Sequence, residues 1–199
     1  MGTQRPDEQL ERIAAEACGL ARLAARLAGC ISVEQVARAV REASEELWSW
    51  DAFWITVRQK GCGWLDALIR VDTVDGQRVD FPPDRAEASQ FMIAASLADG
   101  APLLMNRAHG ETGTGLARFG DIERGLASLM FAPLRLGGEI LGVVSVQSRE
   151  PGFFCERDRD LLMRMAEIAA PAVHRCQIER RSAALAGLGQ TLSAVTSAR

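Results

Sequence analysis

The strongest constraint on the fold lies in residues 127–176, where two β-rich runs flank a pair of glycines and a long amphipathic segment follows. Gly137-Gly138 separates residues 128–136 from residues 139–148 and suits the positive φ angles of a two-residue hairpin turn. The later segment repeats apolar residues three and four apart, the spacing of one buried helix face: Leu161, Leu162, Met165, Ile168, Ala169, Ala172, Val173 and Cys176. This block predicts a hairpin packed on a helix, and it holds no acid, base or nucleophile arranged for chemistry.

The upstream half predicts more helices and more antiparallel strands. Alternation in residues 64–72 is expected to put Leu65, Ala67, Ile69 and Val71 on one face. Residues 106–125 have no regular pattern and carry five glycines, and so long a loop in a compact domain is usually functional or disordered. The other expected elements are helices over 7–27, 33–48 and 85–97, with Ser32 capping the second, and strands over 52–59, 77–81 and 102–105.

A set of short motifs near the hairpin resembles the end of a GAF domain. The motifs are Pro133-Leu134, Gly138, Leu141-Gly142-Val143-Val144-Ser145-Val146, Phe153-Phe154, Asp158 and Leu161-Leu162. The resemblance covers about residues 20–180. It implies an α+β fold with a central antiparallel sheet of five to six strands, flanked by helices that include long N- and C-terminal ones. It also implies a small-molecule pocket between the sheet and its long loops.

Three segments follow from this resemblance. Residues 1–30 are expected to form a dimerising and signalling helix, residues 31–176 the GAF-like domain, and residues 177–199 a linker helix. Pro171 is expected to bend the C-terminal helix or end it early. Five residues near the N-terminus recur 165 positions later: Leu20, Ala21, Leu23, Leu27 and Ser32 match Leu185, Ala186, Leu188, Leu192 and Ser197. Either residues 177–199 start a second similar domain, or the bias toward Ala and Leu alone produced the match.

Composition narrows the partners and the compartment. The net charge of −3 gives no electrostatic reason to expect direct nucleic-acid binding. No apolar run approaches a membrane span, and the N-terminus lacks the apolar core of a signal peptide. The chain is therefore expected to be cytoplasmic, with no membrane partner.

The cysteines and histidines do not indicate a metal site or a covalent cofactor. The five cysteines have no close pairs, and Cys18, Cys30 and Cys176 are expected to be small apolar fillers in helices. No cysteine lies between Cys62 and Cys155, which disfavours both a covalent bilin and the methionine-sulfoxide-reducing branch of the family. Gln147-Ser148 and Arg159 depart from the cyclic-nucleotide-binding pattern. The cofactor, if any, stays unknown.

The resulting hypothesis is a noncatalytic sensory domain from a larger bacterial signal-transduction protein, such as a sensor histidine kinase. It would bind an unidentified small molecule, form a homodimer through its terminal helices and act on an output domain. The alternatives are an effector-binding or dimerisation domain of a transcription regulator, and a thiol-based redox enzyme using Cys62. The residues expected to line the pocket are Trp54, Trp64, Met92, Asn106, His109, Arg118, Phe119, Met130 and Gln147.

Overall fold

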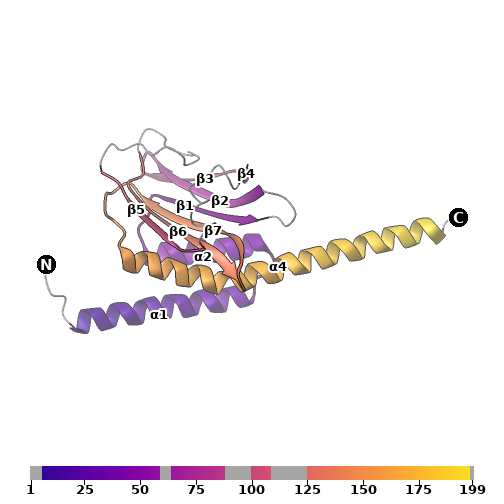
Figure 1. Ribbon diagram of the computed structural model, residues 1–199, viewed down its shortest axis with the longest axis horizontal. Coiled ribbons are helices and arrows are strands. Elements are labelled where there is room, and N and C mark those ends of the chain that lie inside the picture. The colour runs from indigo at the N-terminus through magenta and orange to yellow at the C-terminus, as the bar shows by residue number, and fades with distance from the viewer. Residues whose placement is uncertain (1–5, 59–63, 88–99, 109–124, 198–199) are drawn as a thin grey trace.

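The computed structural model describes residues 6–58, 64–87, 100–108 and 125–197. Their strands form one antiparallel sheet in the order β3-β2-β1-β7-β6-β5, and β4 also pairs with β2 (Figure 1). The strands are β1 (Ala52–Arg58), β2 (Trp64–Val74), β3 (Gln77–Phe81), β4 (Asp84–Glu87), β5 (Leu103–Asn106), β6 (Ser128–Leu136) and β7 (Glu139–Ser148). The helices are α1 (Pro6–Ala28), α2 (Val33–Leu47) and α4 (Glu156–Ser197). The expected α+β architecture is confirmed.

The helices cover one face of the sheet, called here the helix face (Figure 1). Helix α2 packs against β2, α4 lies under β5, β6 and β7, and α1 packs on α2 and α4. Each fully buried large apolar side chain contributes about 1.5–3 kcal/mol, so this contact dominates stability. The core there includes Phe53, Ile55, Val71, Met130, Val144 and Val146 from the sheet and Val36, Val40, Leu162, Met165 and Val173 from the helices.

Two local signals in the sequence produce the expected local structure. Ser32 caps α2, because its side chain accepts a hydrogen bond from the backbone N–H of Gln35 at 3.3 Å. Gly137 and Gly138 adopt φ angles of +56° and +85° in the turn between β6 and β7. Positive φ at both central residues matches the twist of the flanking strands, which is why a Gly-Gly turn closes this hairpin.

A bulge in β2 corrects the expected alternation. Ile55 lies opposite Ile69, but Thr56 lies opposite Ala67, so Leu68 is the extra residue. The bulge reverses the orientation of the residues before it. Leu65 therefore lies on the sheet face opposite the helices, whereas Val71 lies in the core on the helix face.

The prediction of a helix from Arg85 is wrong over its first residues. Asp84–Glu87 form strand β4, which pairs with residues Trp64–Ala67 of β2. Strand β3 pairs with β2 only from Arg70 to Val74, so the remaining backbone of β2 is open to a second partner. The rest of the predicted helix, 88–99, lies outside the described residues.

Helix α4 does not end at Pro171. It runs unbroken from Glu156 to Ser197, with Pro171 on its exposed side, and its last turns project past the sheet (Figure 1). From Ile178 to Leu188 every side chain is exposed. Within the described part of the chain, no helix has an apolar stretch sufficient to span a bilayer.

Candidate functional site

The sheet face opposite the helices, called here the open face, carries a second buried apolar cluster. Leu103 and Met105 of β5 and Leu126 pack partly buried at its margin. Aromatic and branched apolar side chains of this kind are the usual lining of small-molecule sites. The buried members are Trp54, Leu65, Leu129, Phe131 and Val143.

Polar side chains are buried within this cluster on the central strands. Thr56 and Ser145 are fully buried and Gln147 is 5% exposed. The Thr56 hydroxyl donates to the carbonyl of Val143 at 3.4 Å, and Gln147 Nε2 donates to Ser145 Oγ at 2.7 Å. Among the described residues, the Gln147 amide oxygen accepts no hydrogen bond. The open face therefore combines buried aromatic side chains with an amide acceptor that has no partner among the described residues.

An ion cluster fixes the strand ends beside Gln147. Arg149 Nη2 lies 2.9 Å from Asp72 Oδ1, and Arg149 Nη1 lies 3.3 Å from Asp51 Oδ1. Asp51 Oδ2 also accepts from the backbone N–H of Arg149 at 2.7 Å and from the hydroxyl of Ser148. Asp72 is 1% exposed, and a carboxylate so deeply buried must be paired. The cluster ties β1 and β2 to the start of the connection between β7 and α4.

The structure divides the residues expected to line the pocket. Trp54 and Gln147 lie on the open face, because Trp54 pairs with Ser145 and Ala52 with Gln147 across β1 and β7. Met130 lies in the core on the helix face. Trp64 is 42% exposed and precedes Leu65 on the opposite side of β2.

Asn106 has a structural set of partners. Its Oδ1 accepts from Ser128 Oγ at 2.6 Å, and its Nδ2 donates to the carbonyl of Phe154 at 3.4 Å. Asn106 thus holds β5 and β6 to the segment before α4. The other expected lining residues, Met92, His109, Arg118 and Phe119, lie outside the described residues.

Sequence reasoning missed Thr56, Ser145 and Phe131 on the open face. Thr56 and Ser145 alternate with core residues in β1 and β7, so period-two alternation was a usable signal for both. The same rule puts Phe131, next to Met130, on the open face. Sequence alone does not show this for Phe131, because residues on both sides of it are apolar and no polar neighbour marks which face is which.

The cysteines differ in exposure. Cys30 and Cys176 are buried, and burial raises the pKa of the Cys176 thiol, which keeps it protonated and unreactive. Cys18 is exposed, so the expectation that it fills the core is wrong; it lies within 3.1 Å of Arg22 Nη1. Cys62 lies outside the described residues. In the part of the chain that the structure describes, no three His, Cys, Asp or Glu side chains converge on a metal site.

Comparison with known families identifies the domain. A family model described as GAF domain matches residues 30–174, which is most of the chain. The chain belongs to the GAF family. The match ends within α4, so the α4 residues that project past the sheet lie beyond it. A comparison with curated protein sequences finds no significant match.

Solved structures with the same GAF fold come from several kinds of protein. The GAF domain of a phosphoenolpyruvate-protein phosphotransferase from Coxiella burnetii is 13% identical with a TM-score of 0.64, and the match covers 84% of this chain and 98% of that one. Residues 122 to 287 of a methyl-accepting chemotaxis protein are 19% identical with a TM-score of 0.61, covering 80% of this chain and 98% of that one. Such similarity establishes the fold, and GAF domains occur as regulatory domains of signal-transduction proteins.

The expectation that the chain is not an enzyme is corrected by a third structure. Free methionine-R-sulfoxide reductase from Neisseria meningitidis, solved with its substrate, matches with a TM-score of 0.62 at 15% identity, over 83% of this chain and 92% of that one. The GAF fold therefore serves enzymes as well as regulatory domains. The absence of residues arranged for catalysis in 127–176 and of any cysteine between Cys62 and Cys155 therefore does not exclude an enzyme.

Proposed function

We propose that this GAF domain is a regulatory module of a cytoplasmic signal-transduction protein and that it binds a small molecule on the open face. The observation that carries the proposal is the burial of Thr56, Ser145 and Gln147 beside the ring of Trp54. Ligand sites are mostly apolar with a few polar atoms that fix orientation, and this face has that composition. The expected lining residues of the irregular segment, among them His109 and Arg118, stay part of the proposal.

The route from ligand to output runs through β7 and α4. Gln147 on β7 would contact the ligand, Arg149 follows in the ion cluster, and α4 begins at Glu156. A ligand that prefers one arrangement of this connection shifts the population of α4 positions by at most its difference in affinity for the two arrangements. The open face and α4 are thus connected by a short, well-anchored segment.

The terminal helices would form a homodimer and carry the signal to an output domain, such as a histidine kinase module. Apolar side chains are exposed on both helices: Leu10 and Ile13 on α1, and Leu185 and Leu188 on α4. In this proposal residues 1–30 and 177–199 flank a domain over 31–176, and the last residues begin a second similar domain. A second copy of the chain would cover the exposed apolar surface.

The ligand is tested by native mass spectrometry and an absorbance spectrum of freshly purified protein. We expect an added mass that denaturation removes. Gln147→Met keeps the side-chain volume and removes the amide. The fraction of protein that retains the ligand should therefore fall by roughly tenfold. Gln77→Met, on the exposed edge strand β3, is the matched control and should retain the wild-type occupancy.

Two results would contradict the proposal. One is equal occupancy in Gln147→Met and wild type. The other is the absence of any retained mass together with no thermal shift in a panel of amino acids, nucleotides and carboxylates.

A further inference from the structure

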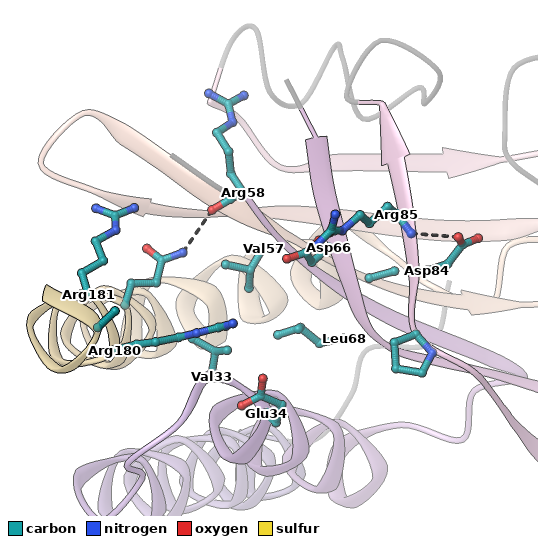
Figure 2. Close-up of a pocket in the computed structure, with 14 residues that line it drawn as sticks. Val33, Glu34, Val57, Arg58, Asp66, Leu68, Asp84, Arg85, Arg180 and Arg181 are labelled. Atoms are coloured by element: carbon teal, nitrogen blue, oxygen red, sulfur yellow. Dashed lines mark hydrogen bonds and ion pairs between the residues drawn. The ribbon is translucent and has the colours of Figure 1, made fainter. Parts of the chain in front are cut away.

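A groove of about 770 Å³ lies at the edge of the sheet, where α4 leaves the body of the protein (Figure 2). Its lining comes from α2, α4, the end of β1, and β2 and β4. Val33, Val57 and Leu68 form its apolar floor, and all three belong to the core on the helix face or pack against it. The groove is therefore separate from the open face that carries Gln147.

Positive charge in the groove has no partner among the described residues. Among the residues that the structure describes, the guanidinium groups of Arg180 and Arg181 form no ion pair or side-chain hydrogen bond. The neighbouring acids are mostly engaged: Asp66 pairs with Arg85 at 3.1 Å, and Asp84 Oδ2 lies 3.1 Å from a guanidinium nitrogen of Arg70.

Glu34 is the one lining carboxylate without an ion pair among the described residues, so the unpaired charge in the groove is positive. The whole chain carries −3, and this local excess of positive charge is not a property of its general composition.

The arginines are arranged around the apolar floor. Figure 2 shows Arg180 lying across the groove between Val57 and Val33, while Arg181 stands at its rim and the Arg58 side chain points away from the floor. A guanidinium group presents a planar set of donors that matches a carboxylate or a phosphate. Apolar floor and cationic wall together fit a ligand with one anionic end and one compact apolar part.

We propose that this groove is a second binding site, for a small organic anion that joins a carboxylate or phosphate to a compact apolar group. The ligand would contact α4 through Arg180 and Arg181 and the sheet through Val57 and Leu68. Gln177 already links these elements, since its Nε2 donates to the carbonyl of Arg58 at 3.1 Å. A bound anion would add contacts at the same junction and hold the first projecting turns of α4 against the sheet.

The site is tested by calorimetric titration of the whole chain with phenyl phosphate and with benzoate. We expect at least one of them to bind with a dissociation constant of about 1 mM or tighter. The comparison of the two separates a phosphate ligand from a carboxylate ligand. Benzyl alcohol and inorganic phosphate, which each carry half of the recognised chemistry, should bind at least about tenfold more weakly.

The double variant Arg180→Gln with Arg181→Gln should weaken binding of the better anion by about tenfold or more. The matched control is Arg12→Gln with Arg38→Gln, which removes two exposed helix arginines outside the groove and should leave affinity unchanged. Hydrogen exchange adds an independent readout, because the bound anion should slow exchange of the amides in residues 177–184.

Three outcomes would overturn the proposal: dissociation constants above about 1 mM for both anions, benzyl alcohol binding as tightly as phenyl phosphate, or equal losses in the two double variants. The Gln147→Met variant should bind the anion normally. Failure of the groove and failure of the open face as ligand sites are thereby distinguished.

Discussion

At the scale of single residues, the family motif around Phe154 and Asp158 has a structural explanation. Asp158 Oδ2 accepts from the backbone N–H of Cys155 at 2.8 Å, and Oδ1 accepts from Trp48 Nε1 at 2.9 Å. The first bond satisfies an N–H at the start of α4 that has no partner inside the helix. Phe154 is buried and meets Trp48 edge to face at 6.4 Å. These contacts join α2 to the start of α4.

Gly142 in the same motif is required by the closeness of β7 to β1. A Cβ atom at Gly142 would lie 2.0 Å from the carbonyl oxygen of Thr56 and 3.0 Å from Val57 Cα. Those are backbone atoms of the neighbouring strand and cannot rotate away. Gly142→Ala should therefore lower the free energy of unfolding by about 3 kcal/mol, measured by urea denaturation.

Gly187→Ala is the control for this substitution. Gly187 lies in the projecting part of α4, and a Cβ atom added there would meet nothing within 4 Å. Alanine should therefore leave stability unchanged or raise it by up to about 1 kcal/mol. A Gly142→Ala protein as stable as wild type would show that β7 and β1 do not approach this closely.

At the scale of secondary-structure elements, a pair of arginines holds α1 to α2. Arg26 Nη2 lies 2.6 Å from Glu46 Oε1, and Arg22 Nη2 lies 2.9 Å from Glu46 Oε2. The hydrogen bond from Arg26 has the largest effect and that from Arg22 the next, and both lower the pKa of Glu46 below its ordinary value of 4.5. The contact is half-exposed, so its contribution is modest and sensitive to salt.

The sign of this pKa shift predicts an acid-dependent loss of stability. Because folding lowers the pKa of Glu46, the ionised carboxylate stabilises the fold above 4.5, and this contribution is lost as the pH falls through the folded value. Glu46→Gln should be less stable than wild type at neutral pH, and the two denaturation midpoints should converge in acid. Glu42→Gln, whose carboxylate reaches Arg26 only at 3.8 Å, is the control. A constant difference between Glu46→Gln and wild type at every pH would contradict this assignment.

At the scale of the whole molecule, the projecting part of α4 exposes large apolar side chains. Leu185 is 69% exposed and Leu188 61%. Ile178 and Leu185 are seven residues apart with Leu188 three further on, the spacing of a coiled-coil seam. Gly187 lowers intrinsic helix stability there, so an isolated helix would be marginal in water.

Leu185→Glu should therefore weaken self-association by at least about tenfold, measured by sedimentation across a concentration series. Ala183→Glu adds the same charge on the other side of α4 and should leave the dimer intact. A wild-type chain that sediments as a monomer at all concentrations would remove the homodimer from the proposed function.

How far the sequence predicts this structure depends on the range of the interactions involved. The Gly-Gly hairpin, the Ser32 cap and the apolar stripe of α4 are local, and all appear as expected. Strand β4 was not expected, because Asp84–Glu87 carry no strand pattern. These residues form a strand because part of the β2 backbone is not paired with β3 and is available to pair with them. For the candidate site, Trp54 and Gln147 share a face, but Met130 and Trp64 do not join them.

The amino-acid sequence alone therefore determined the fold class and the order of most elements, since periodicity, caps and turn residues act over a few positions. The tertiary structure decided which face each strand residue occupies, because the bulge at Leu68 reverses an alternation that looks regular in one dimension. It also decided which charged side chains have no ion-pair partner among the described residues. Only the meeting of α4 with the sheet shows that Val57 and Arg180, far apart in the chain, line one groove.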